Sequence, residues 1–142
     1  MKFFEFCRLV LDQEELVNYM QRRGVLKRTM PCDKCHGVMS VQRLERAVDG
    51  VCFRCARCKT TRSIRSGSFL EYFKMPLPTF AVVVFLLQAE TLLKHIAELL
   101  DLSERAVIDC ANLVREQFGK YLIDHGERLG GDGVVVQVLL NV

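Results

Sequence analysis

The chain lacks a long hydrophobic run, and this absence limits where the protein can reside. Its longest apolar stretch covers residues 80–87 and stops at Gln88. A membrane-spanning helix needs about 18 or more such residues, so the sequence predicts no membrane partner. The N-terminus also lacks the sustained apolar core of a cleavable signal peptide, because Arg8 and Asp12 interrupt it. We therefore expect an intracellular protein, in the nucleus if the host is eukaryotic and otherwise in the cytoplasm.

The sequence also lacks the residue patterns of a catalytic site. His95 and His125 have no partners at the spacing of a metal or nucleophile site. The glycines of residues 130–133 are not followed by the Lys-Ser/Thr pair of a phosphate-binding loop. Cys52 or Cys110 could act as a nucleophile only with a base nearby, and none occurs at a recognisable spacing. We therefore expect no enzyme activity and no small-molecule substrate.

Cysteines, by contrast, are frequent, and four of the seven form two Cys-x-x-Cys pairs. An odd number of cysteines without a secretion signal disfavours a disulfide framework. A Cys-x-x-Cys turn places two thiolates on one side of a tight backbone knuckle. Two facing knuckles then supply the four soft ligands of a tetrahedral Zn²⁺ ion. The sequence thus predicts one structural zinc ion, bound by Cys32, Cys35, Cys55 and Cys58.

Two neighbouring residues leave the exact ligand set open. Cys52 forms an overlapping Cys-x-x-Cys pair with Cys55, and His36 is close enough to the first knuckle to compete as a ligand. Alternation along a strand places Cys52 on the face opposite Cys55, which favours Cys58 as the fourth ligand. Spacing alone does not decide between them.

Short antiparallel strands are predicted around the two knuckles. Residues 38–44 and 51–55 have strand patterns and are separated by a turn signal at 48–50. A last strand and turn are expected at 63–69. The sequence therefore predicts a zinc ribbon over residues 30–74.

Helices are predicted on both sides of this ribbon. Within an N-terminal helical segment, 1–29, a helix begins at Asp12, whose side chain can cap it, and ends at Gly24. After the ribbon, two closely spaced prolines are expected to break the structure, with a domain boundary near residue 75. An almost wholly apolar helix is expected at 79–90.

The remaining helical part, which completes a predicted domain at 75–125, has the pattern of a helix-turn-helix. Apolar residues recur at helical spacing over 92–100 and 106–114, and Ser103 can cap the second helix. An ordinary helical hairpin in a core is the alternative, and residues 124–126 are expected to form a turn. The predicted fold class is thus α+β, a small zinc ribbon of short antiparallel strands flanked by an N-terminal helix and a C-terminal helical, helix-turn-helix-like bundle.

The distribution of charge suggests a DNA partner more clearly than its total does. The net charge is +3, and four thiolates with one Zn²⁺ would leave about +1. Within residues 54–65, however, five basic residues occur without any acid, which favours contacts with phosphates over a merely solvated strand edge. The second helix of the helix-turn-helix supplies weaker candidates, because Glu104 and Asp109 would repel phosphates. The candidate DNA-binding residues are Arg54, Arg57, Lys59, Arg62 and Arg65, with Arg105 and Asn112 as the weaker pair.

Several short motifs occur in a fixed order along the chain. They are Arg23-Gly24-Val25-Leu26, Pro31-Cys32-x-x-Cys35, Phe53-Arg54-Cys55-x-x-Cys58, Ser63-Ile64-Arg65-x-Gly67-Ser68-Phe69, Leu77-Pro78 with the helical pattern to Arg115, and Gly130-Gly131-x-Gly133. In this order the chain resembles, over nearly its whole length, the N-terminal region of Merlin-type DDE transposases and related bacterial insertion-sequence transposases. That region consists of a zinc ribbon and a helix-turn-helix, so the resemblance implies a DNA-binding front end.

The same resemblance argues against catalysis. In the family, the glycine-rich turn leads into the first strand of an RNase H-like core, where a Val-Glu-Ile-Asp-Glu stretch supplies the first metal-binding aspartate. Here that position is Leu139, which cannot bind Mg²⁺, and two-metal phosphoryl transfer needs carboxylate oxygens. Residues 126–142 are therefore predicted to be a remnant of the first catalytic-core strand, in a fragment truncated before its catalytic core.

We thus expect a zinc-dependent DNA-binding fragment without strand-transfer activity of its own. Two alternatives remain from the sequence. The zinc ribbon could instead be a protein-protein interaction module, or the chain could be an inert, decayed transposase fragment. A homo-oligomer or a protein partner is compatible with each of these interpretations.

Overall fold

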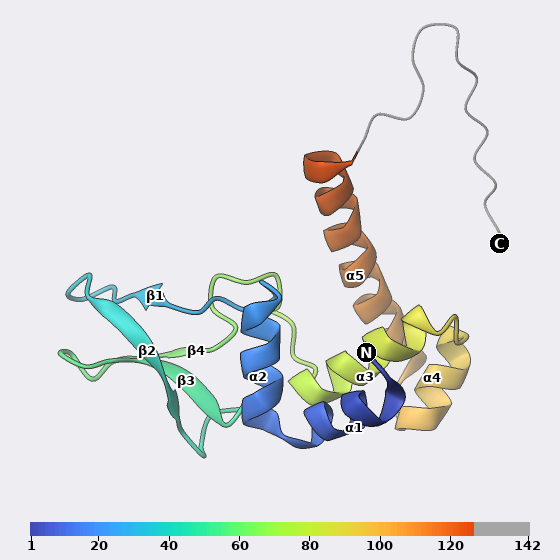
Figure 1. The fold of residues 1–142 in the computed structure, drawn as a ribbon, viewed down its shortest axis with the longest axis horizontal. Helices are drawn as coiled ribbons and strands as arrows, with labels where there is room; N and C mark the ends of the chain where they lie inside the picture. Colours follow the sequence, from blue (N-terminus) through green and yellow to red (C-terminus); the bar gives the residue numbers. More distant parts are fainter. Residues whose placement is uncertain (127–142) are drawn as a thin grey trace, which may run out of the picture.

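The computed structural model describes residues 1–126, and these form five helices and one four-stranded antiparallel sheet (Figure 1). The predicted α+β class is confirmed. Figure 1 shows the sheet at one end of the molecule and most of the helices at the other, with α2 between them. In the part of the chain described here, no helix combines the length and the apolar character that a bilayer crossing requires.

Two helices precede the sheet, α1 (Phe3–Leu11) and α2 (Gln13–Arg22). The Asp12 carboxylate accepts hydrogen bonds from the amides of Glu14 and Glu15, at 3.1 and 3.0 Å, and so caps α2 as predicted. Gly24, at a φ of +75°, follows the end of this helix in the left-handed conformation that glycine adopts without strain.

The sheet has the strand order β1-β2-β3-β4, from four short strands. The ladder pairs Met39 with Cys55 and Arg43 with Val51, so the strand predictions for 38–44 and 51–55 are confirmed to within one residue. The strands are β1 (Met30–Pro31), β2 (Val38–Arg43), β3 (Val51–Cys55) and β4 (Thr61–Ser63).

The last strand lies two residues earlier than the sequence predicts. Residues 64–69 turn away from the ladder because they bury Ile64 completely and Arg65 almost completely, and Leu70 follows them into the core. The prediction of a strand continuing past Ser63 is wrong, whereas the predicted turn is present.

Three helices follow, α3 (Leu77–Gln88), α4 (Leu93–Leu100) and α5 (Glu104–His125). The prolines begin α3 instead of breaking the structure, because Pro76 is its N-cap and Pro78 lies in its first turn, where no backbone donor is missed. The Ser103 hydroxyl accepts from the Ala106 amide at 3.1 Å and caps α5 as predicted.

Helix α5 is longer than expected. The turn predicted at 124–126 is wrong for Asp124 and His125, which are helical, and Gly126 is the C-cap. The His125 ring stacks on Tyr121 with 4.5 Å between ring centroids, a contact that supports the last turn. The predicted remnant strand at 126–142 lies, beyond Gly126, outside the described residues.

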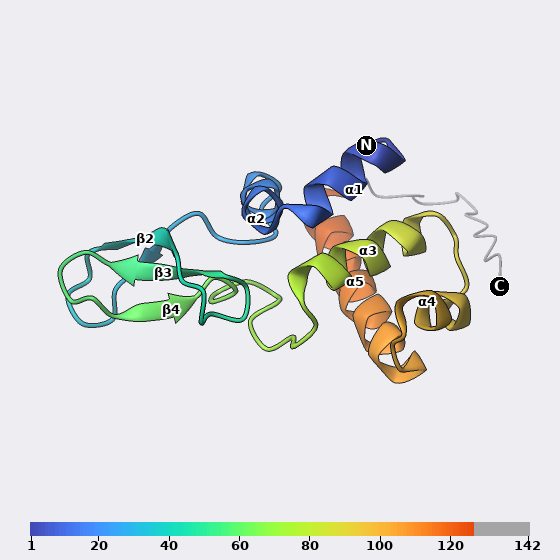
Figure 2. The same ribbon diagram turned by 90° about the horizontal axis from the view of Figure 1, so that it is seen from below.

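The hydrophobic core runs from the sheet into the helices. Phe69 and Phe73 pack on Phe80, with ring centroids 6.4 and 5.9 Å apart, so apolar contacts continue across residue 75. Figure 2 shows the segment after β4 leading from the sheet into α3. The sheet is thereby attached to the helices through packed side chains as well as through the backbone. Fully buried side chains of this hydrophobic core include Phe53, Ile64, Leu70, Leu77, Val83, Ile96 and Val107.

Candidate metal centre

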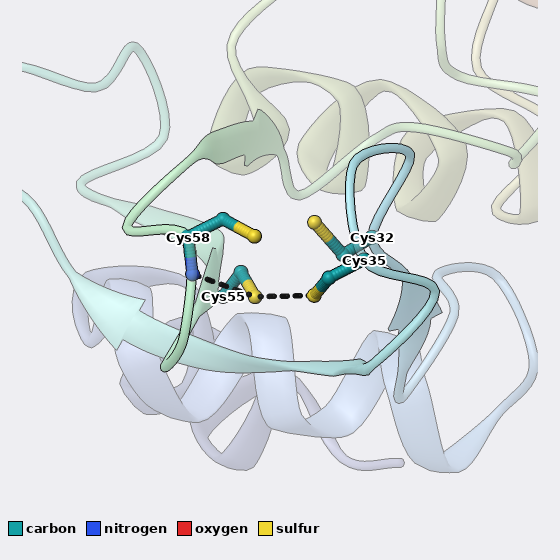
Figure 3. Close-up of side chains that lie close together, drawn as sticks. All are labelled: Cys32, Cys35, Cys55 and Cys58. Atoms are coloured by element: carbon teal, nitrogen blue, oxygen red, sulfur yellow. Dashed lines mark hydrogen bonds between the residues drawn. The ribbon is translucent and has the colours of Figure 1, made fainter.

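The four cysteines of the two pairs meet at one place. Cys32 and Cys35 lie in the loop between β1 and β2, whereas Cys55 and Cys58 lie at the end of β3 and in the loop before β4. Figure 3 shows the two pairs facing each other across a small gap. All four sulfurs lie within 4.8 Å of one another, and the Cys35 and Cys55 sulfurs are 3.5 Å apart. We call this group the cysteine cluster.

The two knuckles have the same backbone frame. In the first, the Cys32 amide donates to the Gly37 carbonyl, and the His36 amide donates to the Cys32 carbonyl, both at 2.8 Å. The residue after the second cysteine takes a left-handed conformation in each knuckle, with φ values of 56° and 58°. The second knuckle repeats both bonds at 3.0 Å, with Cys55, Lys59 and Thr60 in the equivalent positions.

Hydrogen bonds to sulfur stabilise the first thiolate of each knuckle. The Thr60 hydroxyl lies 3.4 Å from the Cys32 sulfur and, with the backbone amides of Cys35 and Lys34, lowers the pKa of Cys32 to about 6. The Cys58 amide donates to the Cys55 sulfur at 3.4 Å and lowers the pKa of Cys55. The site is thus prepared to carry negative charge.

The fourth thiol shows why this charge needs a cation. The nearby Cys35 thiol, then burial and the Cys32 thiol, raise the pKa of Cys58 to about 12. Four thiolates so close together repel one another, and a divalent cation removes that repulsion. All seven cysteines of the chain are free thiols. The cysteine cluster is therefore positioned to bind a metal ion.

The two competing ligands lie outside the cysteine cluster. Cys52 is buried in β3, where its ladder partners are Gln42 and Ser63. His36 is exposed, in the left-handed position that follows Cys35. The structure therefore brings together the four cysteines that the sequence favours and neither alternative.

The predicted phosphate contacts around the second knuckle differ in their availability. Arg57 and Lys59 are exposed, and Arg54 on β3 is partly exposed. Arg62 is exposed on β4 but forms an ion pair with Asp33 of the first knuckle. These four residues remain candidates, with Arg62 the least free of them.

The prediction of a phosphate contact is wrong for Arg65. Its side chain is 6% exposed, and its guanidinium binds the equally buried carboxylate of Asp49. A buried arginine with a paired carboxylate has neither the access nor the unpaired charge that a phosphate contact requires. Sequence reasoning missed this pair because Asp49 precedes Arg65 by 16 residues and lies in the turn predicted at 48–50.

An exposed basic residue at the cysteine cluster was missed. Lys34 precedes the second cysteine of the first knuckle, the position that Arg57 holds in the second knuckle. A Cβ at Gly37 would lie 4.0 Å from the Arg57 Cδ, so the Arg57 side chain lies beside the first knuckle. The signal was the repeat of a basic residue in the two Cys-x-x-Cys pairs.

The weaker candidates lie on α5. Arg105 is exposed and forms an ion pair with Asp109 one turn later, at 3.1 Å. Asn112 is exposed and accepts a hydrogen bond from Arg115 at 3.2 Å. Both side chains therefore already have partners on their own helix.

Comparison of the chain with models of known protein families, with curated proteins and with solved structures finds no match in any of the three. The resemblance to Merlin-type transposases, including the helix-turn-helix assignment of α4 and α5, stays a prediction from the sequence.

Proposed function

We propose that this chain binds DNA through a basic ribbon that a zinc ion holds in shape. Zn²⁺ is the metal we assign, because four thiolates in a closed site suit its soft, tetrahedral coordination. The observation that carries the proposal is the exposure of Lys34, Arg57 and Lys59 on the two knuckles of the cysteine cluster. The two facing knuckles bring these charges together, and phosphates recognise such a group.

The charge of the chain supports the ribbon as the phosphate-binding part. Residues 30–74 contain nine Lys and Arg against four Asp and Glu, so they keep about +3 after a zinc–thiolate site contributes −2. Residues 75–126 contain four Lys and Arg against seven Asp and Glu. Phosphates are repelled by that excess of acid, so we assign DNA contact to the ribbon and not to α4 and α5.

The contact set differs from the one that the sequence predicts. Arg65 is removed because it is buried, and Arg62 is left aside because Asp33 already neutralises it. Lys34 is added. Four phosphate contacts predict a log–log salt slope of about −3.6, at roughly −0.9 per contact. The proposed set is Lys34, Arg54, Arg57 and Lys59.

Fluorescence anisotropy with a labelled DNA duplex tests the proposal. The zinc-loaded protein is titrated at several salt concentrations, and then again after chelation of the metal. Replacement of Lys34, Arg57 and Lys59 by alanine should reduce the salt slope by about three contacts, to near −1. Lack of binding by the zinc-loaded protein at low salt would refute the proposal.

A charge-matched variant is the control. Lys94, Arg115 and Lys120 are exposed and lie on α4 and α5, so their replacement by alanine removes the same charge from the helical part. The proposal requires the salt slope of this variant to stay near that of the unmodified chain. An equal loss in both variants would mean that only net charge matters.

A protein-protein interaction module is the second candidate. The excess of acid in residues 75–126 and the exposed apolar side chains of α5, Phe118 and Leu122 among them, favour it. This candidate becomes the leading one if the zinc-loaded chain fails to bind DNA. Neither candidate assigns a catalytic step to the chain.

A further inference from the structure

The C-terminal half of α5 carries apolar side chains that the rest of residues 1–126 leaves exposed. Phe118, Tyr121 and Leu122 are 64%, 60% and 61% exposed. Their spacing of three and four residues places them on one face of the helix, and we call them the α5 stripe. Figure 1 shows this half of α5 extending beyond the other helices.

The α5 stripe continues the buried face of the same helix. Val107 and Ala111 are buried and Val114 is partly buried, on the side of α5 that packs against α3 and α4. Phe118 and Leu122 extend this series at intervals of four residues. The charged side chains of the last turns, Glu116 and Lys120, pair with each other away from the stripe. The face is thus built as a packing surface.

We propose that residues 133–142 of the same chain dock on the α5 stripe. Seven of these ten residues are Val or Leu, and none is charged. The stripe covers about 6 Å along the helix axis, at 1.5 Å per residue. The seven residues 126–132 can span about 23 Å, so the chain can return over the stripe without being stretched.

A second copy of the chain is the competing occupant, and the available area argues against it. At their exposed fractions the three side chains offer roughly 400 Å², whereas a stable interface buries about 800 Å² per partner. A tethered segment needs far less area, because a short linker gives it an effective concentration of roughly millimolar. The stripe therefore suits a segment of its own chain better than a partner from solution.

Nuclear magnetic resonance of the zinc-loaded full chain tests the proposal. We expect nuclear Overhauser contacts from the Phe118 and Tyr121 rings to the Val and Leu methyl groups of residues 133–142. Leu122→Glu should remove these contacts and shift the amide signals of that segment. Ile123→Glu is the control, because Ile123 is 84% exposed but about 100° further around the helix. In this control variant, the contacts from the Phe118 and Tyr121 rings to residues 133–142 should persist.

Two other results would overturn the proposal. Contacts across the stripe between labelled and unlabelled chains, with a doubled mass, would identify a second copy as the occupant. Absence of any contact between the stripe and residues 133–142 would show that the segment does not dock. A chain ending at Gly126 gives an independent readout, since amide exchange over residues 118–125 should rise at least about tenfold. None of these measurements involves DNA. The docking proposal can therefore fail or hold whether or not the chain binds DNA.

Discussion

The guanidinium of Arg65 binds both carboxylate oxygens of Asp49, with N–O distances of 2.7 and 2.6 Å, and the two side chains are only 6% and 4% exposed. The remaining guanidinium nitrogen of Arg65 donates to the carbonyls of Phe73 and Met75, the latter at 2.8 Å. One side chain therefore fixes the β2–β3 loop, the turn after β4 and the segment that enters α3.

Arg65→Ala should destabilise the folded protein by about 3–5 kcal/mol, because it leaves the Asp49 carboxylate buried without its partner. Chemical denaturation of the zinc-loaded protein measures this loss. Arg57→Ala removes the same charge from an exposed position and should change the free energy of unfolding by no more than about 0.5 kcal/mol. Equal effects would mean that the buried pair contributes nothing specific.

The ligand set can be tested by single substitutions. Cys55→Ala should abolish stoichiometric metal binding, because only three of the four thiolates of the cysteine cluster remain. Cys52→Ala and His36→Ala should each retain one metal ion per chain, since neither residue belongs to the cysteine cluster. Metal content and the absorption of the Co²⁺-substituted protein are the measurements. Loss of the four-sulfur spectrum in either control would require a revised ligand set.

Metal loading should release fewer than four protons at pH 7.5. The pKa of Cys32 is about 6, so its thiol has already ionised, whereas Cys58, with a pKa of about 12, must lose its proton to the solution. Protons compete for the ligands as the pH falls, so metal affinity should decrease more steeply below about pH 6. Proton release in a weakly buffered indicator solution is the measurement.

Thr60→Val tests the cause of this ionisation. The Thr60 hydroxyl is the largest contribution to the lowered pKa of Cys32, and its removal should return that pKa toward 9. The variant should then release more protons per metal ion at pH 7.5, by at most about one, because the backbone amides of Cys35 and Lys34 still lower the pKa of Cys32. Thr61→Val is the matched control, because Thr61 is exposed on β4. An unchanged proton count in Thr60→Val would contradict this assignment.

Neutralising the acids at the start of α5 separates the two possible DNA-binding surfaces. Glu104 and Asp109 are exposed beside Arg105. If α5 faced DNA, Glu104→Gln with Asp109→Asn would strengthen binding by removing repulsion from phosphates. The ribbon proposal predicts an affinity within about twofold of the unmodified chain. A gain of about tenfold or more would move the interface to α5.

The sequence predicted the parts of the structure that depend on local chemistry. Asp12 and Ser103 cap helices because their side-chain oxygens reach nearby amides, and this needs no knowledge of the fold. The same holds for the cysteine pairs, since each Cys-x-x-Cys turn is a local backbone structure. Two facing turns need only the hairpin of β2 and β3 to meet.

What the sequence did not predict depends on distant partners. Nothing local distinguishes Arg65 from Arg57 or Arg62, because its burial follows from Asp49 and from carbonyls eight and ten residues away. Likewise, a proline breaks a helix in its interior but is tolerated at its start, so the role of Pro76 and Pro78 follows from where α3 begins. The extra length of α5 has a local cause in the stacked Tyr121–His125 pair, but the glycine at 126 favoured the prediction of a turn at 124–126.

The lengths of the outer strands limit how the ribbon can meet other chains. β1 has two residues and β4 has three, and these are the first and last strands of the order β1-β2-β3-β4. An edge this short offers too few free amides and carbonyls to recruit another strand, so the sheet gives little template for aggregation. The ribbon can therefore expose its knuckles while the sheets of neighbouring molecules do not join edge to edge.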